Sequence, residues 1–169
     1  MKKSLVLTGM MGVGKSTIGK LLAKILNIKF IDTDNLITER EGKSIKSIFK
    51  INGEKYFRDV ERRISLEMLK KGSCVIALGG GAFVDNQIRD QVLKTSVSFW
   101  LDYEVKNIIK RFSGQNRRPL LDVKDLEESM NKIYEQRKKI YKLSNYRIDC
   151  NKIDKNQITK KILEFYENN

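Results

Sequence analysis

Histidine is absent from this 169-residue chain, and cysteine and proline are scarce. Without histidine, imidazole metal sites are excluded and a general base has to be another group, such as a carboxylate. The two cysteines, Cys74 and Cys150, are isolated and form neither a disulfide framework nor a metal cluster, which is typical of a reducing cytosol. Apolar runs stay well below the roughly 18 residues of a membrane helix, so no membrane span is predicted.

The amino-terminal Met1-Lys2-Lys3 is basic, like the start of a secretion signal, but the apolar run after it is short. That run is broken by Gly9 and Lys15, and no small-residue pattern typical of a cleavage site follows. We therefore expect a cytoplasmic protein.

The chain carries a formal net charge of +13, from 34 basic and 21 acidic side chains. A positive charge of this size can attract a nucleic acid, an acidic membrane surface or small anionic ligands. The lysines are scattered over the exposed faces of expected helices, without zinc-finger spacing or a basic heptad. We favour a solvated surface with no nucleic-acid or membrane partner. The length fits one domain over 1–169, and a monomer is expected because nothing demands a partner.

Short apolar runs alternate with helical patterns along the whole chain. This alternation predicts right-handed crossovers and a three-layer α/β/α fold with a five-stranded parallel sheet. Ligands of such sheets bind at the carboxyl ends of the strands. Two helices are expected on either side of Gly53, the first over 44–51. The expected strands are 4–8, 29–32, 74–78, 96–101 and 146–150.

The strongest motif is Gly9-Met10-Met11-Gly12-Val13-Gly14-Lys15-Ser16-Thr17, which matches the phosphate-loop pattern G-x-x-x-x-G-K-[ST]. Its glycines let backbone N–H groups surround an anion, and the helix that follows adds its positive end. Lys15 is expected to reach the β- and γ-phosphates of ATP, and Ser16 to ligate Mg²⁺. The predicted nucleotide-binding residues of this loop are Gly12, Val13, Gly14, Lys15, Ser16 and Thr17.

Asp32 and Asp34 follow the second expected strand. Alternate carboxylates there can point into one pocket, one toward the waters of a metal ion and one toward a substrate hydroxyl. The alternative is that Asp34 only caps the next helix, and the pair alone does not decide between them. Asp34 is our candidate proton acceptor, since phosphoryl transfer tolerates a weak base when positioning and charge stabilisation dominate.

Two arginines interrupt helical stripes that should be apolar or neutral. Arg137 falls in the stripe of a helix expected over 125–144, and Arg58 stands one turn before Glu61. An inward guanidinium needs an anion, and its planar fork matches a carboxylate. Spacing alone slightly favours a plainer alternative, in which Arg58 pairs with Glu61 and Arg137 extends its charge into water.

Two more segments are expected at the ligand edge of the sheet. Gly79-Gly80-Gly81 ends the third strand, where consecutive glycines permit either close approach to a ligand or a tight turn, and we favour the ligand. The basic segment 113–124 holds Pro119 and is expected to be a mobile lid. Arg117 or Arg118 in this lid can place its charge on the transferring phosphate.

Together these motifs resemble those of shikimate kinases over essentially the whole chain. The phosphate loop alone is common to many nucleotide-binding proteins, whereas the arginine motifs together are much more specific. The resemblance implies a P-loop fold of the nucleoside monophosphate kinase type. It also implies transfer of the γ-phosphate of ATP to the 3-hydroxyl of shikimate, on the route to chorismate and the aromatic amino acids. The matching segments are the loop with Thr17-Ile18-Gly19, Asp32-x-Asp34, Gly53-Glu54-x-x-Phe57-Arg58-x-x-Glu61, the triple glycine, Arg118-Pro119-Leu120-Leu121 and Arg137-x-x-x-Tyr141.

The resemblance also implies roles for individual residues, with a substrate region over about 32–62. Asp34 would orient the attacking hydroxyl and, with Lys15 and Arg118, form the catalytic set. Arg58 and Arg137 would grip the substrate carboxylate. The other implied roles are the backbone of Gly79, Gly80 and Gly81 at the substrate, Arg118 as the lid residue on ATP, Arg111 stacked on adenine, and Asp32 on Mg²⁺ through a water.

Three features depart from the family pattern. Thr38 stands where glutamate is frequent, Ala77 replaces a frequent serine near the metal, and Arg117 doubles the lid arginine. These departures bear on metal geometry and on the identity of the lid arginine. Two alternatives stay open: another small-metabolite kinase with this loop, such as a gluconate kinase, or a regulatory protein that binds nucleotide without turning over a metabolite.

Overall fold

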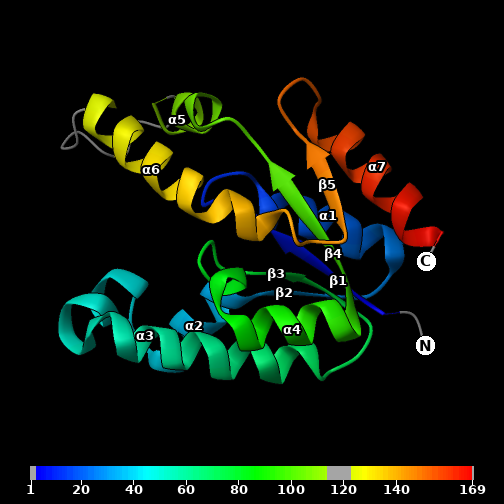
Figure 1. The fold of residues 1–169 in the computed structure, drawn as a ribbon. Helices are drawn as coiled ribbons and strands as arrows, with labels where there is room; N and C mark the ends of the chain where they lie inside the picture. Colours follow the sequence, from blue (N-terminus) through cyan, green and yellow to red (C-terminus); the bar gives the residue numbers. More distant parts are fainter. Residues whose placement is uncertain (1–2, 114–122, 169) are drawn as a thin grey trace.

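The computed structural model describes residues 3–113 and 123–168 of the chain (Figure 1). Arg117, Arg118 and most of the expected lid segment therefore lie outside the described residues. No helix in the described ranges combines the length and the apolar character needed to cross a bilayer.

Five parallel strands form one sheet in the order β2-β3-β1-β4-β5. The expected strands are confirmed, with ends that differ by one residue at most. β1 and β4 are buried along their whole length, as expected of central strands covered on both faces. The strands are β1 Ser4–Thr8, β2 Lys29–Asp32, β3 Cys74–Ala77, β4 Ser96–Asp102 and β5 Tyr146–Asp149.

Helices cover both faces of the sheet and complete the expected three layers (Figure 1). α1 packs against α7 on one side, α3 packs against α4 on the other, and α6 lies against α5 and the short helix η1. The helices are α1 Lys15–Leu26, α2 Thr33–Glu41, α3 Ile45–Leu69, η1 Ala82–Val84, α4 Asn86–Thr95, α5 Val105–Ser113, α6 Val123–Tyr141 and α7 Lys155–Glu167.

α3 joins the two helices that the sequence predicts on either side of Gly53. Gly53 has φ 83° and ψ 169° inside this helix, a conformation that essentially only glycine adopts. The helix is therefore kinked at this point, and its second part carries Arg58 and Glu61 toward the carboxyl edge of the sheet.

Candidate active site

The loop 9–17 connects β1 to α1 and is shaped by its glycines. Gly9, Gly12 and Gly14 have φ angles of 130°, 79° and 98°. Among the described residues no side chain caps α1, which begins at Lys15, and its first turn contains no acidic residue. The first N–H groups and the positive end of the helix are therefore available to an anion. This is the geometry of a phosphate-binding loop.

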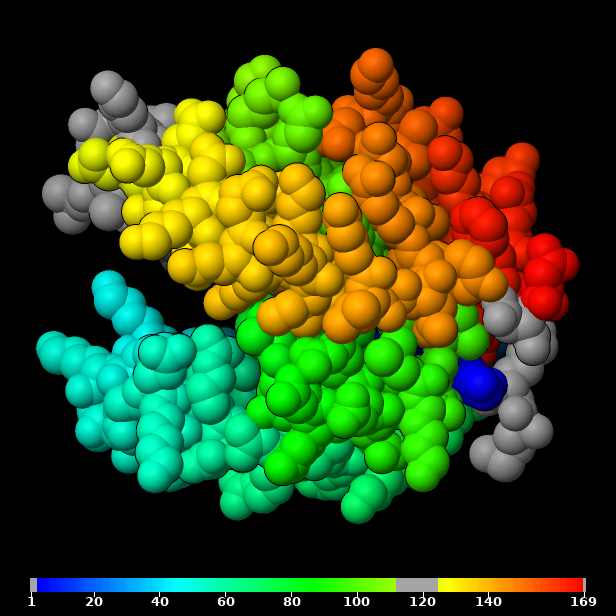
Figure 2. Space-filling model, in the orientation of Figure 1, coloured from blue at the N-terminus to red at the C-terminus, as the bar shows by residue number. Residues whose placement is uncertain are grey.

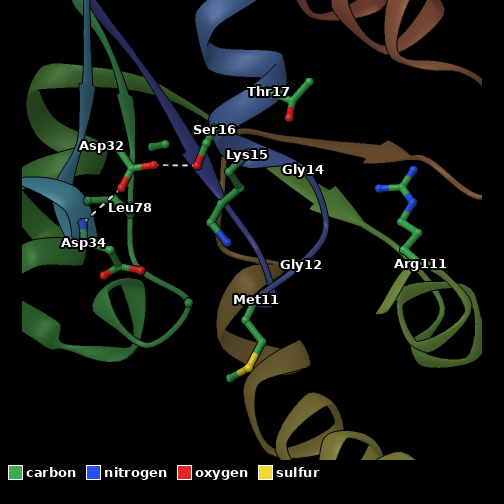
Figure 3. A pocket seen from close by; sticks show the side chains of 12 residues that line it. Met11, Gly12, Gly14, Lys15, Ser16, Thr17, Asp32, Asp34, Leu78 and Arg111 are labelled. Carbon is green, nitrogen blue, oxygen red and sulfur yellow. Dashed lines mark hydrogen bonds between the residues drawn. The ribbon is translucent and has the colours of Figure 1, made fainter. Parts of the chain in front are cut away.

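Lys15 lies folded over its own loop. Its Nζ donates to the carbonyl oxygens of Gly9 and Met10, both at 2.8 Å. Burial lowers the pKa of Lys15 to about 8, and the carboxylates of Asp34 and Asp32 partly oppose this shift. Figure 3 shows the ammonium pointing into the pocket, with the two aspartates on one side of it. The side chain is thus placed where a phosphate would replace the two carbonyl acceptors.

Asp32, rather than Asp34, caps the helix that follows β2. Asp32 Oδ1 accepts from the backbone N–H of Asp34 at 3.1 Å and of Asn35 at 3.2 Å. Its other oxygen accepts a hydrogen bond from the Ser16 hydroxyl, as Figure 3 shows. The alternative in which Asp34 only caps this helix is therefore wrong, because Asp32 is the capping residue. Ser16 and Asp32 meet at the mouth of the loop.

Asp34 is left free to face the pocket. Burial raises the pKa of its carboxyl group, and Lys15 partly offsets this effect. A Cβ at Gly79 would stand 2.5 Å from Asp34 Oδ1 and 2.9 Å from Glu61 Oε1. A side chain at Gly79 would therefore require both carboxylates to move.

Arg58 pairs with Glu61, as the plainer interpretation of its spacing predicted, and it also lies beside the triple glycine. It forms an ion pair with Glu61 at 2.7 Å and a longer one with Glu54 at 3.4 Å. A Cβ at Gly81 would lie 2.5 Å from Arg58 Nη1, so the guanidinium also borders the triple glycine. Glu61 is buried, which raises the pKa of its carboxyl group. The sequence pattern indicated Glu61 only as a partner of Arg58, and their spacing of three residues was the available signal for its place beside the glycines.

Arg137 reaches the triple glycine instead of extending into water. Its Nη1 donates to the carbonyl oxygen of Gly80 at 3.1 Å, and the Tyr141 hydroxyl donates to the same oxygen at 2.5 Å. Within the described ranges no carboxylate forms an ion pair with Arg137. Its charge is therefore available for an anionic ligand, whereas the charge of Arg58 is already shared with two glutamates.

Arg111 lies on the other side of the phosphate loop from the aspartates (Figure 3). Its guanidinium stacks 4.3 Å from the centre of the Tyr103 ring, and Nη2 donates to the Tyr103 hydroxyl at 2.9 Å. This position borders a cavity of about 220 Å³ between the loop and α7. The cavity is lined by Val13, Gly14, Thr17, Ile18, Arg111, Lys155 and Ile158.

A larger cavity of about 410 Å³ joins the loop to the aspartates and the glycines. Arg111 borders both cavities, so the two are neighbours along the phosphate loop. On the molecular surface a hollow separates the first part of α3 from α6 (Figure 2). The larger cavity is lined by Met11, Gly12, Gly14, Lys15, Ser16, Thr17, Asp32, Asp34, Ala77, Leu78, Gly80 and Arg111.

Two of the departures from the family pattern lie at this site. The Thr38 hydroxyl donates to the backbone oxygen of Asp34 at 3.0 Å and so supports the first turn of α2. Ala77 borders the cavity without offering a polar group. The doubled arginine, Arg117 with Arg118, lies outside the described residues.

Comparison with known proteins agrees with this geometry. The family model for shikimate kinase matches residues 11–167, which include most of the phosphate loop, both aspartates and both arginines. The chain belongs to the shikimate kinase family. Among curated members of this family, shikimate kinase from a Sulfurihydrogenibium species is 39% identical over 161 residues, which span 95% of this chain and 96% of the relative.

Solved structures of the shikimate kinase family confirm the fold. Shikimate kinase from Acinetobacter baumannii, in complex with shikimate, superposes with a TM-score of 0.90 at 29% identity, covering 99% of this chain and 94% of that protein. A gluconokinase from Sinorhizobium meliloti 1021 reaches a TM-score of 0.61 at only 15% identity, with 98% and 92% of the two chains covered. The second likeness concerns the fold alone, so the gluconate alternative has no support beyond a shared P-loop architecture.

Proposed function

We propose that this chain transfers the γ-phosphate of ATP to the 3-hydroxyl of shikimate, giving shikimate 3-phosphate and ADP. The observation that carries the proposal is the meeting of two unlike anion sites. A backbone loop with a partly buried lysine adjoins two arginines that border three glycines, and Asp34 stands between the two sites. Membership of the shikimate kinase family supports shikimate as the small carboxylated alcohol that enters the second site.

The loop 9–17 would hold the β- and γ-phosphates with its N–H groups and with Lys15. Arg111 would stack on the adenine ring in the smaller cavity. Within the described residues no three acidic, histidine or cysteine side chains gather as a metal cluster. Ser16 and Asp32 nonetheless fit Mg²⁺, which proteins usually bind with few side chains, several waters and the substrate phosphates. When bound, Mg²⁺ would neutralise charge that develops on the phosphate oxygens.

The acceptor would bind with its carboxylate at Arg137 and Arg58, and the backbone of Gly79, Gly80 and Gly81 would close one side of the pocket. Asp34 would hold the attacking hydroxyl and take its proton as the oxygen–phosphorus bond forms and ADP leaves. The raised pKa of Asp34 favours this role, since a carboxylate whose pKa lies closer to neutral pH is a better base. Arg118 remains our candidate for the lid arginine that completes the site.

We further propose that the enzyme acts as a monomer in the cytoplasm, with ATP and shikimate as its small-molecule partners. Lys15 and Asp34 each belong to the same chain as the arginines, so the site needs no second copy.

The decisive experiment measures ADP release by purified protein with Mg²⁺ and ATP. We expect release when shikimate is present and hardly any with gluconate or with no acceptor. Lys15→Ala should lower turnover at least about a hundredfold, because a charged donor to the transferring phosphate is lost. Lys20→Ala is the matched control, an exposed lysine of the same helix whose loss should leave turnover unchanged.

Two results would contradict the proposal in different ways. ADP release that does not depend on shikimate would refute the acceptor and leave the nucleotide site standing. Equal release with gluconate would make the alternative kinase the better assignment.

A further inference from the structure

One stripe of α6 carries three polar side chains to the carboxyl edge of the sheet. Arg137 and Tyr141 both donate to Gly80 O, as described above. Tyr134, one turn earlier, donates to Asp102 Oδ1 at 2.8 Å. The first two contacts belong to the acceptor site, but the third has no place in the proposed reaction.

Asp102 is a buried carboxylate at the last position of β4, with a side chain that is 4% exposed. Arg147 on β5 donates to its second oxygen through Nε and lies 2.7 Å away through Nη2 as well. Arg147 therefore balances the charge, and Tyr134 provides the hydrogen bond of the remaining oxygen. Buried carboxylate oxygens need such donors, because leaving one unsatisfied is costly.

These contacts tie α6 to two strand ends. In the sheet order, β3 and β4 flank β1 on either side, and β1 leads directly into the phosphate loop. Tyr134 fastens α6 to the end of β4, while Arg137 and Tyr141 reach the glycines that follow β3. α6 thus crosses above the start of the phosphate loop. Its contact with β4 therefore affects the position of the Arg137 guanidinium.

We propose that Tyr134 is a positioning residue for the acceptor site: its hydrogen bond to Asp102 seats α6 so that Arg137 meets the substrate carboxylate. This inference rests on the proposed function, because it takes Arg137 as the carboxylate-binding group. Displacement of a binding group by about 1 Å is enough to weaken its contacts strongly. Tyr134 acts through Arg137 and touches no substrate itself.

Mutation can separate the contribution of the Tyr134 ring from that of its hydroxyl group. The ring packs against the core, and Lys138 Nζ lies 5.5 Å from its centre. Tyr134→Phe keeps both contacts and removes only the donor to Asp102. The helix then has to shift to admit water to the free carboxylate oxygen, or Asp102 has to move toward Arg147.

The test compares Tyr134→Phe with wild type in steady-state kinetics and in calorimetric titration with shikimate alone. We expect KM and Kd for shikimate to rise about threefold to tenfold, less than a hydrogen bond to a charged group contributes because Tyr134 acts only through Arg137, while KM for ATP stays within about twofold. Tyr166→Phe is the matched control. It removes another tyrosine hydroxyl bond, from α7 to Lys3 O at 2.5 Å, and should lower the melting temperature without changing either KM.

Each outcome decides the proposal. An unchanged shikimate KM in Tyr134→Phe overturns it, and so does an equal rise in both KM values with a lower melting temperature, which would indicate a purely structural bond. If wild type neither binds nor phosphorylates shikimate, the proposed function itself fails and the positioning role fails with it. If wild type is active and Tyr134→Phe has an unchanged KM for shikimate, only the positioning role is refuted.

Discussion

The two halves of the site are built in opposite ways. The nucleotide half is built mainly on one continuous loop, 9–17, and on the start of α1, with Arg111 and Asp32 added at its borders. The acceptor half is assembled from α2, α3, the glycines after β3 and α6, and it relies on side chains. A site made from one loop keeps its geometry while that loop is intact, whereas the assembled half depends on how distant helices pack on the sheet.

The halves also differ in how their charges are satisfied. In the nucleotide half, Lys15 is partly buried and donates to two carbonyl oxygens of its own loop. In the acceptor half, Arg58 is already neutralised by Glu61 and Glu54. Only Arg137, of these three cations, combines a place beside the glycines with a lack of any carboxylate partner in the described part of the chain. We therefore propose that Arg137 contributes most of the binding of the substrate carboxylate.

The largest effect is expected from Arg137→Ala. Loss of the free guanidinium should raise KM for shikimate about a hundredfold, because a partly buried carboxylate loses its charged partner, and leave KM for ATP nearly unchanged. Initial-rate measurements with each substrate varied in turn provide the test. Arg40→Ala is the control, since Arg40 pairs with Glu67 on the surface. A comparable loss of ATP affinity would place Arg137 in the wrong half of the site.

A smaller effect is expected when a methyl group is added at Gly79, in the acceptor half of the site. In Gly79→Ala the new methyl group would press on Asp34 and Glu61, so we expect KM for shikimate to rise about twentyfold, as for overpacking in a rigid site. Gly19→Ala provides matched crowding outside the site, because its Cβ would stand close to the Phe30 ring in the core. This control should lower the melting temperature and spare both KM values. A variant of Gly79 with normal shikimate kinetics would show that the carboxylates can yield.

The two halves should also respond to pH in opposite ranges. The pKa of Lys15 is lowered to about 8 by burial, so protonated Lys15 is lost as pH rises through that value in the free enzyme. We expect kcat/KM for ATP to fall about fivefold between pH 8 and pH 9. The raised pKa of Asp34 means that this carboxylate is protonated, and lost as a base, at a higher pH than an ordinary aspartate. The decrease in rate at low pH should therefore appear in kcat/KM for shikimate.

Profiles of kcat/KM against pH for each substrate, with the other substrate held at saturation, measure both the decrease at high pH and the decrease at low pH.

Lys15 also makes the stability of the protein depend on pH. Above pH 8 the folded chain has released a proton that the unfolded chain still holds, so this contribution to the free energy of unfolding increases with pH up to the ordinary lysine pKa. A flat ATP profile up to pH 9 would contradict the partly buried, shifted lysine.

The difference between the halves also explains how much the sequence could predict. The phosphate loop and the strand ends were predicted because their signals are local: nine consecutive residues for the loop and short apolar runs for the strands. Asp32 and Asp34 were placed at the correct edge. Which of them caps α2 was not predictable, because it depends on backbone angles at the end of β2. The spacing of Arg58 and Glu61 allowed an ion pair or a ligand site, and the folded chain shows the ion pair at the edge of the triple glycine.

Contacts between distant segments had no local signal at all. Tyr134 and Asp102 are separated by 32 residues, and neither lies in a recognisable motif. Their meeting follows from the sheet order and from the angle at which α6 crosses β4. The kink at Gly53 was predictable, since the glycine marked the break between the two helical stretches that make up α3.

The smallest effect is expected on the nucleotide side, from a change that mirrors the loss of the Tyr134 hydroxyl. Tyr103→Phe removes the 2.9 Å hydrogen bond to Arg111 Nη2 and keeps the ring on which the guanidinium stacks. Arg111 also donates to Val13 O at 3.4 Å, and the stacking remains, so we expect KM for ATP to rise only about twofold with KM for shikimate unchanged. Paired kinetics of the two tyrosine variants would test the comparison directly. If Tyr103→Phe weakened ATP binding tenfold, the nucleotide half would depend on a distant side chain as much as the acceptor half does.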